Sequence, residues 1–411
     1  MFFVYKILIN IIFFFSPLIL IIRLIKEKED PRRFKEKLGF FLKKRKNGNL
    51  IWFHGASVGE IQSIIPLIEK FEKSKNINQI LITSNTISSS KIIQKYKLKK
   101  TIHQFFPIDC DLVSRKFINY WKPSKVFFVD SEIWPNTINN LSEKKIPIIL
   151  LNGRITKKTF NRWLFFPNFA QSLFDKFKLC LSSSLESKKY LKKLGAKRIK
   201  FLGNLKFSQS ENSNLELNEN LKRFIRSRKS WCASSTHFNE EKFCGLVHIK
   251  LKKKYKNLLT IVIPRHVSRV KLIENELNSL NLKVHLDEPP KKISANTDIY
   301  LVNSYGKTKS FYKISKTVFL GGSLINHGGQ NPLEAVRYGC NVLHGPNISN
   351  FKEIFRFLKQ KKFSQKVNNQ NDLIKTLEKT LHKKTYPKKI IRNLKIVGLN
   401  ILNKTYKEVN F

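Results

Sequence analysis

A carboxylate that allows two interpretations follows an early apolar run of the chain. The run Ile51–His54 predicts a buried strand, Gly55 ends it, and the sequence SVGE at residues 57–60 leads into a helical pattern of isoleucines. Ser-x-x-Glu at a helix start is a capping box, in which each side chain satisfies a backbone N–H. A carboxylate just after a strand also lies where ligands bind in α/β sheets. Glu60 is therefore a cap or a catalytic base, and the residues alone leave both open.

Further charged residues follow two other predicted strands. Asp130 and Glu132 come directly after the run 125–129, and paired acids can serve acid/base chemistry. The alternative is that Asp130 or Ser131 caps a helix and that Glu132 is an acid in its first turn. Lys206 follows the run 200–202, but lysine is so abundant in this chain that its position alone indicates little.

The strongest local cluster is a glycine-rich segment at residues 318–351. A predicted strand ends in GGS, residues 321–323, and a second glycine pair precedes Asn331-Pro332-Leu333-Glu334, which is typical of a helix start. Glycines let the backbone approach a phosphate, and a helix N-terminus presents free N–H groups to it. Asn331 and Glu334 could then hold sugar hydroxyls. Two ordinary strand-to-helix turns, with these residues as a capping pair, explain the pattern equally well.

An arginine follows another buried run. In Pro264-Arg265-His266, Arg265 lies at the end of a predicted strand, where its guanidinium could make a bidentate phosphate contact. The aspartates 109 and 111 form a D-x-D pair, a spacing that holds a metal in some enzymes. Because no further carboxylate or histidine accompanies them, a turn or a helix cap is the better interpretation.

The elements that must position these residues alternate between strands and helices. This alternation predicts two doubly wound parallel α/β domains, separated by a polar linker at residues 208–220. The segment 285–298 has the composition of a surface loop, and a last amphipathic helix is predicted from about Lys388 to Val409. The predicted strands are Ile51–His54, Gln79–Thr83, Lys125–Val129, Pro147–Leu151, Leu179–Ser182, Lys200–Leu202, Ser230–Ala233, Leu258–Ile263, Ile299–Val302, Thr317–Leu320 and Val342–His344.

The composition favours an anionic partner. The 411 residues include 78 Lys and Arg against 29 Asp and Glu, which gives a net charge of +49. A general bias toward Lys, Asn, Ile and Phe explains part of this charge. The basic residues are spread along the whole chain, which argues against nucleic acid as the partner. The five cysteines are widely spaced and contain no C-x-x-C, so we expect reduced thiols and neither a zinc site nor disulfides.

The N-terminus differs from the rest of the chain. Residues 1–22 are apolar except for Lys6, Asn10 and Ser16, and a cluster of Lys and Arg follows them. About 20 such residues can cross a bilayer, and the basic flank predicts that the body of the protein lies in the cytoplasm. Because Lys6, Asn10 and Pro17 interrupt the segment, a helix that lies in the membrane interface is the alternative to a span.

Taken in order, the motifs resemble one family, the bacterial 3-deoxy-D-manno-octulosonic acid (Kdo) transferases of lipopolysaccharide synthesis. The resemblance covers nearly the whole chain through WFHGASVGE, SEIWPN, LNGRIT, GNLKF, ASSTHFNEE, PRH, GGSL…GGQNPLEA and GPNISNF. It implies a GT-B fold, in which two Rossmann-like domains face each other across a cleft, and an inverting transfer of Kdo from CMP-Kdo to a lipid A precursor, without metal or cofactor. The implied segments are an anchor at 1–25, an acceptor-side domain at 26–207, the linker at 208–220, a CMP-Kdo-binding domain at 221–387 and a C-terminal helix at 388–411 that packs back on the first domain.

The same resemblance assigns roles to individual residues. Glu60 corresponds to the catalytic base, and Glu132 and Lys206 to residues that support the transition state. The CMP-binding positions are Pro264, Arg265, Tyr305, Gly306, Lys307, Asn331, Pro332, Leu333 and Glu334. Two departures stand out. The family's D-T-M-G-E-L segment matches residues 303–308 here only at Gly306, and Asp130 stands where Glu is usual.

The resemblance also implies a place for the enzyme, the cytoplasmic face of the inner membrane, where anionic lipids would attract the basic flank. Two rivals stay open at this stage. One is another metal-independent GT-B transferase that uses a different nucleotide sugar. The other is a membrane-tethered basic protein that binds nucleic acid, which leaves the ordered strand-end motifs unexplained.

Overall fold

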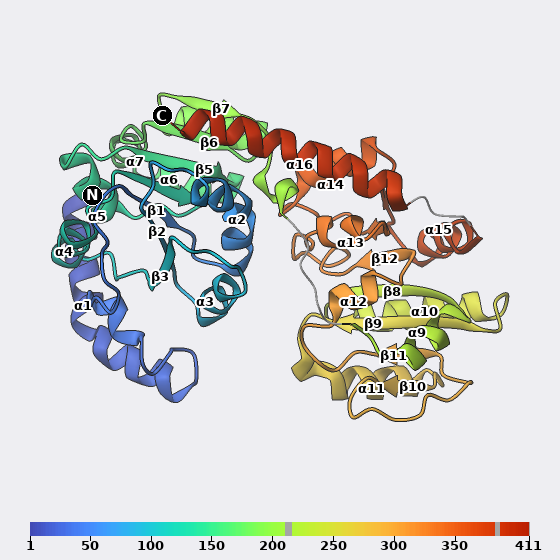
Figure 1. The fold of residues 1–411 in the computed structure, drawn as a ribbon. Helices are drawn as coiled ribbons and strands as arrows, with labels where there is room; N and C mark the ends of the chain where they lie inside the picture. The colour runs from blue at the N-terminus through green and yellow to red at the C-terminus, as the bar shows by residue number, and fades with distance from the viewer. Residues whose placement is uncertain (210–215, 383–386, 411) are drawn as a thin grey trace. The chain divides into compact units, whose positions relative to one another are not determined.

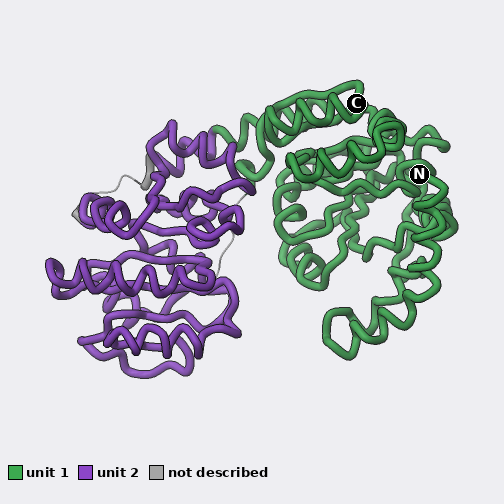
Figure 2. Tube along the Cα trace, turned by 180° about the vertical axis from the view of Figure 1, so that it is seen from behind, with its two compact units in different colours: residues 1–210, 397–411 green, residues 211–396 purple. Residues whose placement is uncertain are grey.

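The computed structural model describes residues 1–209, 216–382 and 387–410 and forms two compact units. Unit 1 comprises residues 1–210 and 397–411, and unit 2 comprises residues 211–396 (Figure 2). Each unit contains one seven-stranded parallel sheet with helices between its strands, as the alternation in the sequence predicts (Figure 1). Of the predicted linker 208–220, residues 210–215 lie outside the described part of the chain.

The sheet of unit 1 has the strand order β3-β2-β1-β4-β5-β6-β7, so the direction of winding reverses between β1 and β4. Ligands of doubly wound sheets bind outside the carboxyl ends of the strands at such a reversal. The strands are β1 (Leu50–His54), β2 (Gln79–Ser84), β3 (Thr101–Phe105), β4 (Lys125–Val129), β5 (Ile148–Gly153), β6 (Leu179–Ser182) and β7 (Ile199–Phe201). The helices are α1 (Phe2–Ile25), η1 (Phe34–Leu38), α2 (Val58–Glu72), α3 (Ile87–Gln94), α4 (Asp111–Trp121), α5 (Pro135–Glu143), α6 (Lys157–Leu164), α7 (Pro167–Phe174), α8 (Leu185–Lys193) and η2 (Leu205–Ser208).

The sheet of unit 2 has the order β10-β11-β9-β8-β12-β13-β14 and reverses between β8 and β12. Its strands are β8 (Lys229–Thr236), β9 (Leu258–Pro264), β10 (Val284–Leu286), β11 (Ile299–Leu301), β12 (Thr317–Leu320), β13 (Asn341–His344) and β14 (Ser364–Lys366). Its helices are α9 (Glu219–Arg226), α10 (Glu240–Lys252), η3 (Val267–Arg269), α11 (Val270–Ser279), α12 (Thr308–Tyr312), α13 (Leu333–Arg337), α14 (Lys352–Gln360) and α15 (Gln370–His382). The last helix, α16 (Pro387–Val409), begins in unit 2 and ends in unit 1.

The sheet of unit 1 is buried on both faces. Neighbouring residues of one strand enter opposite cores, because side chains alternate across a sheet. Trp52 and Phe128 belong to one cluster of buried side chains, while Phe53 and Phe127 belong to the other. Full burial of an aromatic or aliphatic side chain contributes about 1.5–3 kcal/mol, so these two layers hold the strand ends in place.

Both ends of the chain pack on unit 1. The polar residues of α1 contact residues 109–111: the Tyr5 hydroxyl donates to Asp109 Oδ2 at 2.8 Å, and Cys110 Sγ donates to Asn10 Oδ1 at 3.1 Å. The helix is long and apolar enough to cross a membrane. At the other end, the side chains of Ile401, Leu402 and Val409 of α16 join one of the two cores of unit 1.

The expected strands are present, but the sequence did not predict β3, β10 and β14. All three lie at the edges of their sheets, and β10 and β14 have only three residues each. An edge strand is covered less than a central one, so it lacks the continuous apolar run on which the prediction depends. The interpretation of 285–298 as a surface loop was therefore partly wrong, since it includes two residues of β10 and the buried carboxylates of Asp287 and Asp298.

Candidate active site

Glu60 caps helix α2, and its pKa is raised into the range that suits a general base near neutral pH. It lies in the first turn of α2, where the Ser57 hydroxyl donates to Oε1 at 2.9 Å and the Ala56 backbone N–H donates to Oε2 at 2.7 Å. Burial, followed by the negative charges of Glu132 and Asp130, raises its pKa from 4.5 to about 7, although both hydrogen bonds oppose this change. The carboxylate is therefore fixed at the carboxyl end of β1 with a pKa suited to proton transfer near neutral pH.

Glu132 is held by two aromatic side chains. Trp134 Nε1 donates to its Oε2 at 2.9 Å, and His54 Nε2 lies 3.1 Å from the same oxygen. His54 is fully buried at the end of β1, and its Nδ1 lies 2.9 Å from Thr83 Oγ1. The indole N–H of Trp52 also donates to Thr83 Oγ1, at 2.8 Å. The buried His54 and the partly buried Trp134 thus fix the orientation of Glu132.

Lys206 forms an ion pair with Asp130, which belongs with Glu60 and Glu132 to one group of carboxylates. Its Nζ lies 3.5 Å from Asp130 Oδ2, and the Asp130 side chain is 8% exposed. The backbone of Asp130 has a φ of 62°, a left-handed conformation that Asp adopts more readily than most residues. Its N–H donates to the Leu151 carbonyl at 2.9 Å, which holds this conformation. The structure therefore brings Glu60, Glu132 and Lys206 together, with Asp130 as a fourth member of the group.

The CMP-binding candidates all lie in unit 2, at the carboxyl ends of its strands. Pro264 is the last residue of β9, and the exposed Arg265 donates its backbone N–H to the Thr236 carbonyl at 3.0 Å. Tyr305 is 73% exposed, and Gly306 has a φ of 90°, which favours glycine. Lys307 precedes α12 and bonds to the carboxylates of Asp287 and Glu288, and it lines a cavity of about 740 Å³.

The segment 331–334 forms a tight turn into α13. Asn331 Oδ1 accepts the Leu333 backbone N–H at 3.2 Å, so this Asn acts as a cap. Pro332 and Leu333 are buried, while Asn331 and Glu334 are partly exposed and remain accessible to a ligand. The helix has only five residues, so its dipole contributes little to anion binding.

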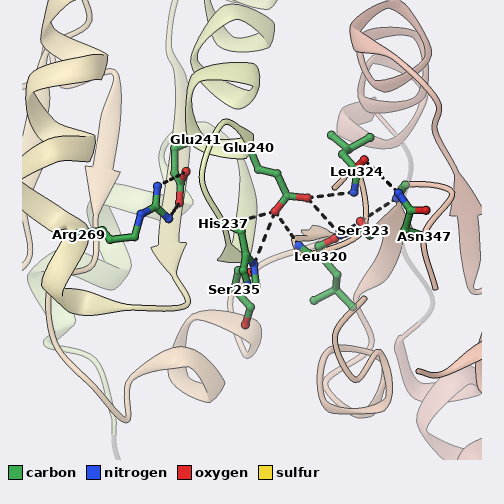
Figure 3. Close-up of polar contacts among 11 residues, drawn as sticks. Ser235, His237, Glu240, Glu241, Arg269, Leu320, Ser323, Leu324 and Asn347 are labelled. Carbon is green, nitrogen blue, oxygen red and sulfur yellow. Dashed lines mark hydrogen bonds and ion pairs between the residues drawn. The ribbon is translucent and has the colours of Figure 1, made fainter. Parts of the chain in front are cut away.

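The glycine-rich loop after β12 already holds a carboxylate of the protein itself (Figure 3). Glu240, which is 1% exposed, accepts four backbone N–H groups: those of His237 at 3.0 Å, Gly322 at 2.6 Å, Ser323 at 3.1 Å and Leu324 at 3.0 Å. These amides are therefore not free to bind a phosphate, and the loop is structural. The pair Glu240-Glu241 in the motif ASSTHFNEE was the signal that the sequence interpretation did not use.

Asp109, the first aspartate of the D-x-D pair, also has a structural role. Asp109 Oδ1 accepts the Thr137 backbone N–H at 2.8 Å, and Oδ2 accepts the Asn136 backbone N–H at 2.9 Å, so Asp109 caps α5. Burial raises its pKa to about 6. Within residues 1–209, 216–382 and 387–410, no group of three or more His, Cys, Asp or Glu side chains could hold a metal ion.

Two parallel-sheet units, each with helices between its strands, define the class of the protein, which has a GT-B fold. A solved structure with this fold is UDP-GlcNAc 2-epimerase from Neisseria meningitidis bound to UDP-GlcNAc. The match has a TM-score of 0.59 and 14% identity and covers 88% of this chain and 98% of the epimerase chain. At this identity the likeness shows the fold alone.

The relatives in sequence identify the family within this class. The 3-deoxy-D-manno-octulosonic acid transferase of Rickettsia bellii is 31% identical over 88% of this chain and 86% of its own length. The transferase of the same name from Haemophilus influenzae is 28% identical over 87% and 86%. The sequence model of the family 3-deoxy-D-manno-octulosonic-acid transferase (kdotransferase) matches residues 32–209. The chain therefore belongs to the Kdo transferase family of lipopolysaccharide biosynthesis.

Proposed function

We propose that the protein transfers Kdo from CMP-Kdo to a lipid A precursor, lipid IVA, with inversion at the anomeric carbon and with Glu60 as the general base. The observation that carries this proposal is the state of Glu60 at the end of β1. Its pKa of about 7 results from burial and from two neighbouring carboxylates. A glutamate that only caps a helix does not require two further carboxylates, Glu132 and Asp130, beside it.

The proposed chemistry is a single displacement. A hydroxyl of the acceptor attacks the anomeric carbon of Kdo, its proton passes to Glu60, and the bond from that carbon to the phosphate oxygen of CMP breaks. Oε1 of Glu60 is the oxygen that takes the proton, because its partner is the rotatable hydroxyl of Ser57, whereas Oε2 is tied to a backbone N–H. One displacement inverts the anomeric carbon and requires no nucleophile from the protein.

Glu132 and Lys206 support the transition state in this proposal. The positive charge that develops on the sugar ring is offset by the carboxylate of Glu132, which His54 and Trp134 hold in place. Lys206 lies against Asp130 and supplies the local positive charge of the acidic group. Because these side chains are already oriented, little reorganisation is needed when charge develops.

The donor is assigned to unit 2 and the acceptor to unit 1. Arg265 is exposed at the end of β9 and can neutralise the leaving phosphate, while Asn331 and Glu334 can hold hydroxyls of the ribose. The backbone of Tyr305, Gly306 and Lys307 completes the proposed CMP site, with Pro264, Pro332 and Leu333 shaping it. In terms of the sequence, residues 26–207 would bind the acceptor and residues 221–387 the donor.

The proposed location is the cytoplasmic face of the inner membrane. The apolar helix α1 has its large side chains exposed, and basic residues follow it in the sequence. The overall charge of +49 suits a surface of anionic lipids. Through the contacts of Tyr5 and Asn10 with residues 109 and 110, the anchor would hold unit 1 near the lipid acceptor.

The test is a transfer assay with purified full-length protein in detergent. CMP-Kdo is generated in the assay, the acceptor is tetraacylated lipid A precursor, and competing nucleotide sugars are added in excess. We expect Kdo transfer that CMP inhibits, and the Arg265→Ala variant should need about ten- to hundredfold more CMP for the same inhibition. Transfer that occurs only with another nucleotide sugar would refute the proposed donor.

A further inference from the structure

Three histidines meet at the carboxyl ends of three neighbouring strands in unit 2. His237 follows β8, His266 follows β9 and His327 follows β12, and these strands are adjacent in the order β9-β8-β12. The ring centroids of His237 and His327 lie 4.4 Å apart, and those of His237 and His266 lie 6.1 Å apart. The cluster therefore lies where β8 and β12 mark the reversal of the sheet, the usual place for a ligand.

His237 has one committed nitrogen and one without a partner. It is 9% exposed, and its Nδ1 lies 3.0 Å from the carbonyl oxygen of Ser235, so Nδ1 carries the hydrogen that this contact needs. Its Nε2 is buried and has no hydrogen-bond partner among the described residues. A buried polar atom without a partner is unfavourable, so a structure that keeps one calls for a ligand or another explanation.

Gly322 provides the space for the rings. Its φ is 64°, and a Cβ at this position would lie 3.1 Å from Cε1 of His237 and 3.2 Å from Cδ2 of His327. Any other residue would be strained in this backbone conformation and crowded by both rings. The glycine thus leaves the two imidazoles close together at the surface of the loop.

The charges around the cluster favour an anion over a cation. Both neighbouring carboxylates already have partners: Glu240 accepts four backbone N–H groups, and Glu241 makes a bidentate pair with Arg269 at 3.0 and 3.1 Å. Burial, and then the charge of His327, lowers the pKa of His237, with a smaller contribution from His266. An anion beside the ring of His237 would oppose both effects, because a nearby negative charge favours the protonated imidazole.

We propose that His237, His266 and His327 bind the carboxylate of the sugar acid in the donor. This inference rests on the proposed function, in which the donor is CMP linked to an octulosonic acid. The carboxylate and the phosphate of such a donor are attached to the same carbon, so their binding sites must be adjacent. Arg265, which is assigned to the phosphate, directly precedes His266 in the chain.

The experiment separates the two anions by comparing CMP-Kdo with CMP, which lacks the carboxylate. The variants are His327→Ala and His266→Ala, whose side chains are exposed and whose loss should leave the fold intact, together with His237→Gln. We expect the KM for CMP-Kdo to rise about tenfold or more in each, which corresponds to the loss of one charge-assisted hydrogen bond. The inhibition constant of CMP should stay within about twofold of the wild type. Arg265→Ala is the contrast, because it should weaken the binding of both molecules.

A pH series gives a second readout. In the wild type, the KM for CMP-Kdo should rise with pH as the imidazolium form of His237 is lost, and His237→Gln should abolish most of this rise. An unchanged KM in all variants, or an equal rise of the CMP inhibition constant, would overturn the carboxylate site. Failure of the proposed function would look different, since then the wild type itself would transfer no Kdo.

Discussion

The substitution Glu60→Gln should stabilise the fold at alkaline pH while it removes activity. The pKa of Glu60 is about 7 in the folded protein and ordinarily 4.5, so its contribution to stability is present at acid pH and is lost as the pH rises from about 4.5 to 7. The difference corresponds to at most about 3 kcal/mol, and to about 1–3 kcal/mol for this half-buried side chain. Gln carries no charge and keeps an oxygen for the N–H of Ala56. At pH 8 the variant should therefore unfold at a higher temperature than the wild type.

The activity of the Glu60→Gln variant should fall, although its thermal stability at pH 8 should rise. A general base typically accelerates a reaction by about 10²- to 10⁴-fold, and Gln cannot take the proton of the acceptor hydroxyl. In the assay with CMP-Kdo and tetraacylated lipid A precursor, kcat should fall by about this factor, while CMP inhibits with an unchanged constant. In the wild type at saturating CMP-Kdo, kcat should increase with pH and level off above the pKa of about 7.

A matched control lies on the same helix. Glu69 is an exposed residue near the C-terminal end of α2, whereas Glu60 lies in the first turn of this helix. Glu69→Gln should therefore leave transfer unchanged. Circular dichroism and thermal melting of both variants verify the fold. If Glu60→Gln transfers Kdo normally, Glu60 is only a cap and the proposed mechanism is wrong. If it is inactive but melts far below the wild type at pH 8, the electrostatic reasoning fails instead.

Two further predictions concern the carboxylates around each site. Glu132→Gln removes a negative charge that raises the pKa of Glu60, so the rising limb of the kcat profile at saturating CMP-Kdo should move to lower pH; a limb at the same pH would contradict this coupling. Glu240→Ala leaves four backbone N–H groups without their acceptor and should destabilise unit 2 by about 3–5 kcal/mol in urea denaturation, with a smaller loss for Glu240→Gln. A loss below about 1 kcal/mol would show that water replaces the carboxylate in the loop.

Local patterns in the sequence predicted the central strands and the residues that follow them. Runs such as Ile51–His54 are continuous and apolar because both faces of the sheet are covered, and this property can be read without a structure. The same property explains the failures, since the edge strands β3, β10 and β14 are less covered and their composition is mixed. Because Glu60, Asp130 and Arg265 each follow a central strand, the sequence also predicts that they lie at the carboxyl ends of the strands of their unit.

The strand order and the partners of each side chain could not be predicted in this way. His237, His266 and His327 are distant in the sequence, and they meet only because β9, β8 and β12 are neighbours. The role of Glu240 could not be predicted either, because three of the backbone N–H groups that it accepts are distant from it in the sequence. A glycine loop has the same sequence pattern whether its amides bind a phosphate or a carboxylate from the same chain. Only the structure shows which anion it holds.

The cap and the base prove to be compatible roles for Glu60, because different contacts control orientation and protonation. The two hydrogen bonds from Ser57 and Ala56 fix the carboxylate at the start of α2, and both lower its pKa. Burial and the charges of Glu132 and Asp130 raise the pKa by more, so the net value still reaches about 7. A base that a capping box already holds needs no further ordering before it acts, because the helix has fixed its position. The sequence SVGE therefore serves the fold through its hydrogen bonds and, in the proposed mechanism, serves the reaction through the acids that surround it.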